Sequence, residues 1–196
     1  DRTVMVGGGE SVIAVTAAGA RVVAGPLPDR RMVDGDRDAG RTAWPQSLSP
    51  APDGVFFLDT TPSLNRARLL RLSPNGSRAS LETVDAGLSF QTSLAFHQGQ
   101  LWMHRDDNVG LVTVLEPSGT LVRRFSSSVP NLGQLQSNGS VLRGAQFWFQ
   151  ELSADGGVRR IPGLMNAQAS APGQAGVWYV FAARDPNDGG FATEPR

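Results

Sequence analysis

The sequence predicts an all-β chain made of short antiparallel strands. Short apolar runs and alternating stretches are bounded by turns, and no window keeps a 3.6-residue apolar period over three turns. Glycine and proline are frequent, with 23 and 13 among 196 residues. A strand–turn–strand pattern recurs four times along the chain. We therefore expect many short strands and little helix.

The strands are expected to form one domain over 1–196. Residues 25–54 contain five prolines and many Arg and Asp, so we predict a long exposed loop insertion there. Residues 163–176 are predicted to be a connection, and 184–196 a polar tail. The predicted strands are Thr3–Val6, Ser11–Thr16, Ala20–Ala24, Val55–Asp59, Arg68–Leu72, Arg78–Val84, Ser93–His97, Leu101–Arg105, Leu111–Leu115, Thr120–Phe125, Ser140–Leu142, Gln146–Leu152, Val158–Ile161 and Val177–Ala183.

The recurring pattern is a hairpin turn, found at Val15–Gly19, Leu72–Gly76, Leu115–Gly119 and Leu152–Gly156. Each segment starts with an apolar residue, has Pro or Ala third, ends in Gly and is followed within five residues by a strand Arg. Pro presets φ and Gly accepts a positive φ, which suits a tight turn. The turn glycines recur at irregular intervals near the roughly 40–50 residues of a four-stranded blade. We therefore predict a β-propeller of about four blades, or a fragment of a larger propeller.

Two strings carry a resemblance to a known family. Leu94 to Trp102 and Asn65 to Gly76 resemble NHL-type β-propeller repeats and the wider group of streptogramin lyases and gluconolactonase-like enzymes. The resemblance covers residues 50–125 well and the rest poorly, and it implies blade architecture, not activity. Since Phe147–Phe149 lie closer to their turn glycine than Trp102 does, we expect the third unit to be short or partly missing.

Closure of the ring is predicted in two ways. Val177–Ala183 could supply the inner strand of the N-terminal blade, which would close four blades into a ring. Alternatively, the blades are part of a ring of six or seven, and a β-sandwich is the remaining alternative. Because the sequence begins with Asp1, we expect the chain to be processed or to belong to a larger chain or assembly.

Composition narrows the partners. Eighteen basic residues balance eighteen acidic ones, which argues against nucleic acid and anionic lipid as partners. The sequence contains no apolar run of 18 residues, so membrane insertion is not predicted. The absence of Cys excludes thiol nucleophiles and Cys-type zinc sites. All the basic residues are Arg, which indicates a GC-rich bacterial source, and we predict an extracytoplasmic location, periplasmic or secreted.

The candidate catalytic residues are His104, Asp106, Asp107 and Glu151. The resemblance to streptogramin lyases implies that the loop after His104 reaches a central site with a metal and a general base. The alternative interpretation is non-catalytic: His104 lies at the surface and Asp106 caps a turn. His97 precedes a Gln-Gly turn and is expected to be a solvated hairpin residue.

Binding candidates are expected at strand ends and in the insertion: Arg105, Asn108, Trp44, Asp59 and Asn65. Asp34, Asp36 and Asp38 are weak metal candidates, because alternating carboxylates suit Ca²⁺, but Ala39 and Pro45 stand where an EF-hand needs Gly and Glu. No cofactor is predicted, and a divalent cation is left open.

The strand aromatics predict packing between blades, with a carbohydrate-stacking platform as the alternative; they are Phe56, Phe57, Trp102, Trp148, Trp178 and Tyr179. The strand arginines are expected to solvate outer strands; they are Arg21, Arg78, Arg123, Arg124, Arg159 and Arg160. The favoured function is a non-catalytic binding or assembly module of an exported protein, which engages a protein or glycan partner through propeller loops. The alternatives are a propeller enzyme of the lyase or lactonase class with a metal near His104, and a lectin.

Overall fold

The computed structural model describes residues 4–8, 11–24, 45–52, 54–61, 66–72, 91–105, 110–127, 132–139, 141–145, 148–165, 167–172 and 177–182. These residues form strands and turns, and no helix occurs among them. No part of the chain described here offers a helix able to cross a membrane. The strands form five small antiparallel sheets, which we number in chain order.

The first and second sheets have three described strands each. The first consists of β1 (Val4–Gly8), β2 (Ser11–Thr16) and β3 (Gly19–Ala24), with β2 in the centre. The second consists of β4 (Pro45–Ala51), β5 (Gly54–Thr61) and β6 (Arg66–Leu72), with β5 in the centre. In both, neighbouring strands are consecutive in sequence, which is the meander of a propeller blade.

The third and fourth sheets have four strands each. The third runs from β7 (Gln91–His97) through β8 (Gln100–Arg105) and β9 (Leu111–Leu115) to β10 (Leu121–Ser126). The fourth runs from β11 (Gln134–Ser137) through β12 (Leu142–Ala145) and β13 (Trp148–Leu152) to β14 (Val158–Met165). The fifth pairs β15 (Ala167–Pro172) with β16 (Trp178–Ala182).

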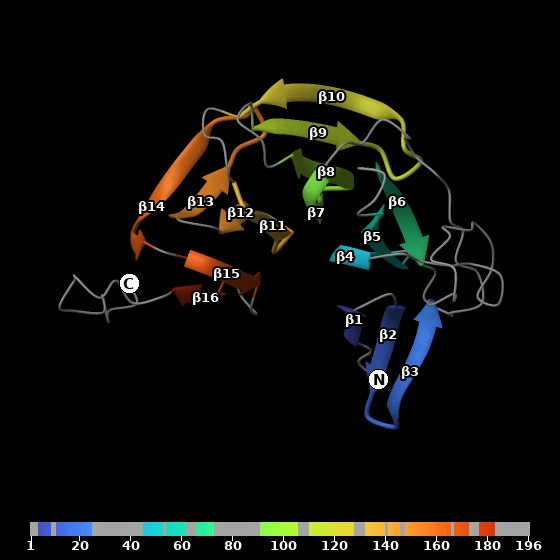
Figure 1. Ribbon diagram of the computed structural model, residues 1–196. Helices are drawn as coiled ribbons and strands as arrows, with labels where there is room; N and C mark the ends of the chain where they lie inside the picture. Colours follow the sequence, from blue (N-terminus) through green and yellow to red (C-terminus); the bar gives the residue numbers. More distant parts are fainter. Residues whose placement is uncertain are drawn as a thin grey trace.

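The sheets follow one another round an arc, and the first and last sheets lie on either side of its open side (Figure 1). The first strand of each sheet contacts the first strand of the next, in the order β1, β4, β7, β11 and β15. Radial sheets whose innermost strands meet in chain order are the arrangement of a β-propeller. The predicted fold class is therefore confirmed, as an open arc of blades.

The core lies between the sheets. One buried cluster joins Phe56 and Leu58 of β5 to Leu94, Leu101 and Met103 of the third sheet. A second cluster lies between the third and fourth sheets and contains Ala95, Trp102, Val112, Val114, Leu132, Leu135, Leu142 and Leu152. The third sheet is thus buried on both faces, which explains why β8 and β9 read as nearly continuous apolar runs.

Two segments predicted to be irregular are strands. The predicted insertion 25–54 contains β4 at its end, and the predicted connection 163–176 contains β15. We expected Pro45 and Pro50 to break regular structure, but β4 is an edge strand that begins at Pro45, and a sheet tolerates proline on an edge strand and at a strand's first residue. Residues 25–44, the predicted strand Arg78–Val84 and the predicted tail 184–196 lie outside the described residues.

Two predictions about blade completeness were wrong. The third sequence unit is a complete four-stranded sheet, β11–β14, and its aromatic run ends on the third strand, whereas Trp102 lies on a second strand. This difference in strand accounts for the shorter spacing to the turn. The predicted closing strand, Val177–Ala183, forms β16 and pairs with β15, so it does not join the first sheet.

Candidate functional site

His104 lies inside the third sheet. It is on β8, where its Cα partners are Ser93 on β7 and Val112 on β9, and its side chain is fully buried. Arg105, at the end of the same strand, is half-buried. The predicted surface position of His104 is therefore wrong, because the strand continues into the packed seam between sheets. Its proposed partners Asp106 and Asp107, and the binding candidate Asn108, lie outside the described residues.

Asp59 is also enclosed by its sheet. We expected it to end a strand, but β5 continues to Thr61, and Asp59 pairs in register with Pro45 on one side and Arg68 on the other. Its side chain is fully buried. The other candidates from this half of the chain lie outside the described residues: Trp44, Asn65, Asp34, Asp36 and Asp38.

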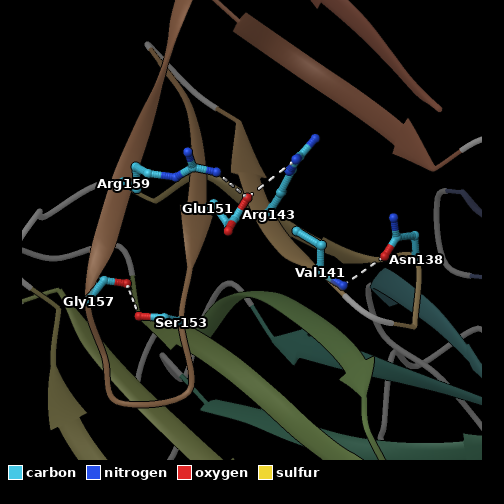
Figure 2. A network of polar contacts seen from close by, with 7 residues as sticks. All are labelled: Asn138, Val141, Arg143, Glu151, Ser153, Gly157 and Arg159. Carbon is cyan, nitrogen blue, oxygen red and sulfur yellow. Dashed lines mark hydrogen bonds and ion pairs between the residues drawn. The ribbon is translucent and has the colours of Figure 1, made fainter. Parts of the chain in front are cut away.

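Glu151 belongs to a row of charges across the fourth sheet. Its Oε2 atom lies 3.3 Å from Nη2 of Arg143 on β12 and 3.1 Å from Nη2 of Arg159 on β14 (Figure 2). The three residues are direct cross-strand partners, so they share one face of the sheet. Glu151 and His104 thus lie in different sheets, and the Glu151 carboxylate is held by two guanidinium groups.

Among the residues that the structure describes, no three or more His, Asp or Glu side chains gather in a way that could hold a metal ion. His104 and Glu151 remain catalytic candidates by prediction only.

Arginine and aromatic side chains meet in two seams between sheets. The Arg123 guanidinium lies 4.8 Å from the ring centre of Trp102 and 5.5 Å from that of Phe125. The Arg143 guanidinium lies 5.2 Å from the ring centre of Phe149 and 5.1 Å from that of Trp178. Such cation–π contacts stabilise packing while leaving part of the guanidinium near water. We expected Arg123 to solvate an outer strand, but it covers Trp102.

His97 links two blades. Its Nδ1 atom lies 2.8 Å from the Ser137 hydroxyl on β11, and its ring packs edge-on against Trp102 with 6.0 Å between centres. Burial lowers the pKa of His97, so the neutral imidazole is favoured. The prediction of a solvated hairpin residue was therefore wrong. The burial of His97 could have been predicted from the alternation of the strand, because His97 lies on the same face as the buried Ala95.

Serine hydroxyls join the innermost strands of the second and third sheets. The backbone N–H of Leu94 donates to Ser47 Oγ at 2.7 Å, and that of Phe96 donates to Ser49 Oγ at 2.7 Å. The register of β4 shifts between Gln46 and Ser49, and Ser47 has φ 54°. This bulge aims both hydroxyls at the free edge of β7, and sequence reasoning missed it because the segment was predicted to be a loop.

The turn after β13 shows the chemistry of the repeated motif. The Ser153 backbone N–H donates to the Gly157 carbonyl at 2.9 Å, the Ser153 hydroxyl lies 3.0 Å from the same oxygen (Figure 2), and Gly156 has φ 90°. The hydrogen bond from Ser153 lowers the pKa of Asp155. At the same end of the sheet, in the turn between β11 and β12, the Val141 N–H donates to Asn138 Oδ1 at 2.8 Å. These hydrogen bonds shape the turns, and the turn geometry alone accounts for glycine at position 156.

Comparison with known proteins gives a structural match but no sequence match. No protein-family model matches the chain, and no curated protein does. Among solved structures, the chain is similar to a calcium-binding protein, regucalcin, from Agrobacterium tumefaciens strain C58, with 17% identity and a TM-score of 0.45. The match covers 69% of this chain and 44% of that one, so the matched part spans less than half the length of that protein.

Proposed function

We propose that the chain is a non-catalytic binding or assembly module, of NHL-like propeller type, that engages a protein partner through its loops and its uncovered sheet faces. The observation that carries the proposal is the first sheet, where four valines are 38–59% exposed on one face: Val4, Val6, Val15 and Val22. A contiguous apolar patch of this kind marks an interaction surface in soluble proteins.

The described catalytic candidates favour this proposal over the enzyme alternative. His104 is enclosed between sheets, and Glu151 is bound by Arg143 and Arg159. A general base needs access to a substrate proton at hydrogen-bonding distance. A lyase or lactonase would therefore require the loop after Arg105 to supply the reacting groups.

Partner and location are part of the proposal. The equal numbers of acidic and basic residues favour a protein or glycan over nucleic acid. An exported, extracytoplasmic protein is consistent with a chain that has no cysteine to oxidise. A lectin is the second candidate, because Tyr179 on β16 is 67% exposed and an exposed aromatic ring can stack on a sugar.

Metal analysis and melting curves separate the binding module from the enzyme. The purified chain is analysed for bound metal and then melted with and without a chelator. The binding module predicts no stoichiometric metal and no shift. A chelator-sensitive melting temperature that disappears in His104→Gln, but persists in the matched His97→Gln variant, would contradict it and support a metal site near His104.

A glycan array tests the lectin. Binding that is lost in Tyr179→Ala, while the melting temperature stays within a few degrees, would make the partner a glycan. No binding by the unchanged chain would remove the lectin and leave a protein partner.

A further inference from the structure

The turn between β11 and β12 contains an Asn-Gly dipeptide, Asn138-Gly139. The sequence has one other, Asn75-Gly76, and serine follows the glycine in both. In such a dipeptide the backbone nitrogen of the glycine can attack the side-chain amide of the asparagine, because glycine has no side chain to hinder the approach. The groups around the turn decide how fast this attack occurs.

Three hydrogen bonds surround the reacting atoms of the turn. The Val141 N–H donates to Asn138 Oδ1 at 2.8 Å (Figure 2). The Gly139 N–H donates to Ser137 Oγ at 2.9 Å, and the same Oγ lies 2.8 Å from Nδ1 of His97 on β7. The oxygen of the side-chain amide and the attacking nitrogen are therefore both held by neighbouring groups.

The directions of these hydrogen bonds suit removal of the proton from the Gly139 nitrogen. Ser137 Oγ accepts from Gly139, so its own hydroxyl proton is available to Nδ1 of His97. His97 accepts this proton in the neutral tautomer that carries its hydrogen on Nε2, and burial favours the neutral ring by lowering the pKa of His97. A neutral imidazole that is one hydroxyl away from an N–H group is placed as a general base.

The other requirements of the reaction are also met in this turn. Negative charge develops on Asn138 Oδ1 when nitrogen attacks Cγ, and the Val141 N–H donates to that oxygen, as the donors of an oxyanion hole do. Gly139 is exposed, and a Cβ built on it would meet nothing within 4 Å. A cyclic imide therefore has room to form, and water reaches it.

We propose that Asn138 is a self-modification site, which this turn converts to aspartate or isoaspartate. The Gly139 nitrogen bonds to Cγ of Asn138 and gives its proton to Ser137 Oγ, whose hydroxyl proton passes to His97. The amide nitrogen Nδ2 takes a proton from water and leaves as ammonia, and His97 returns its proton to water.

The product of this first step is a succinimide, which one water molecule opens. Aspartate forms when the bond from Cγ to the ring nitrogen breaks, and isoaspartate forms when the bond from the main-chain carbonyl carbon to that nitrogen breaks. Either product adds a carboxylate beside the contact between His97 and Ser137, which joins the third and fourth sheets. The proposal goes beyond the binding function proposed above and does not depend on it.

The rate of conversion at Asn138 tests the proposal. It is measured in the folded chain and in the chain unfolded by guanidinium chloride, at one pH and temperature, from the mass change of amide to acid in tryptic peptides. Asn75 calibrates the unfolded rate, because it also precedes Gly-Ser. Asn138 should react at least about tenfold faster in the folded chain, which is less than the roughly 10²–10⁴-fold typical of a general base.

Two variants interrupt the proton path. Ser137→Ala and His97→Gln should each lower the folded rate at Asn138 to the unfolded rate or below it. Ser153→Ala is the matched control, because it removes a serine hydroxyl from the turn between β13 and β14 at the same end of the sheet. It should leave the rate unchanged.

The pH profile separates proton transfer from a structural role of His97. Strands β4 and β11, which pack against β7, carry no titratable side chain. The titratable residues of the other elements in this part of the molecule are Asp59 on β5, His104 and Arg105 on β8, Glu116 after β9 and Arg123 on β10. Burial, rather than a charged neighbour, lowers the pKa of His97. The folded rate should therefore level off above pH 6.5, whereas in His97→Gln it should rise with the hydroxide concentration.

Two results would overturn the proposal. A folded rate at Asn138 no faster than the unfolded rate would show that the hydrogen bonds lock the turn and protect the asparagine. A fast folded rate that persists in Ser137→Ala would remove the serine and the histidine from the reaction. Melting curves accompany each variant, and if His97→Gln is destabilised, Ser137→Ala still decides the outcome, because it removes a single oxygen atom.

Discussion

The first and third sheets are built from similar strands but have different surroundings. In β9 of the third sheet, Val112 and Val114 are fully buried, and the neighbouring strands are covered on both faces. In β2 of the first sheet, an equally apolar run is buried only through Val12 and Ala14. Burial in this molecule thus depends on which sheet lies beside a strand, and the apolar pattern marks a face that needs cover, whether or not cover is present.

The largest contrast is expected from truncating one side chain in each sheet. Trp102→Ala should destabilise the chain by about 3–5 kcal/mol, because it opens a cavity in the seam and removes contacts with His97, Phe125 and Arg123. Val22→Ala should cost less than about 0.5 kcal/mol, because half of that side chain is already in water. Urea unfolding measures both, and equal losses would remove the contrast.

A close approach between backbone segments should give the next effect. A methyl group at Gly144 would lie directly against the Leu132 carbonyl oxygen, and backbone cannot easily move away. Gly144→Ala should therefore cost about 1–3 kcal/mol. Gly139→Ala is the control, because nothing lies within 4 Å and only its φ of 92° is unfavourable, at about 1 kcal/mol. If both variants unfold at the same urea concentration, the fourth sheet is packed less closely than described.

The pH dependence of stability should report the seam through His97. Because burial lowers its folded pKa below the usual 6.5, the unfolded state takes up the proton first as the pH falls through 6.5. Stability is unaffected above that value and decreases below it, by at most about 1.4 kcal/mol per pH unit. The difference between pH 7.5 and 5.5 should be larger in the unchanged chain than in His97→Gln. An identical difference would place His97 in water.

The charge row on the fourth sheet should give the smallest effect. Arg159 is 71% exposed, so its pair with Glu151 is screened, and a double-mutant cycle with Arg159→Ala and Glu151→Gln should couple by about 0.2–0.5 kcal/mol. The Arg143 cycle should exceed it, because Arg143 is largely enclosed between Phe149 and Trp178. Raising the salt concentration should reduce the Arg159 coupling first. A stronger Arg159 coupling would reverse the expected order.

Sequence reasoning recovered the architecture better than the site. Turn chemistry is local, so the Pro-Ser-Gly turn after Leu115 and the strands on both sides of it could be located from residues alone. Strand β4 was missed because its prolines are acceptable only on an edge, and an edge is a property of the assembled sheet. His97 and His104 were placed at the surface for a related reason. The alternation of β7 indicates which face His97 occupies, but the sheet that covers this face comes from another part of the chain.

The most direct test of the account compares labelling at one covered and one uncovered valine. Val22→Cys and Val114→Cys are each treated with a maleimide under native conditions and after unfolding. We predict that position 22 reacts almost as fast as in the unfolded chain. Position 114 is fully buried between the third and fourth sheets and should react at least about 1,000-fold more slowly than in the unfolded chain, because it is exposed only when the chain opens globally. Similar native rates at the two positions would contradict the claim that the exposed valines of the first sheet are uncovered while the matching strands of the third sheet are enclosed.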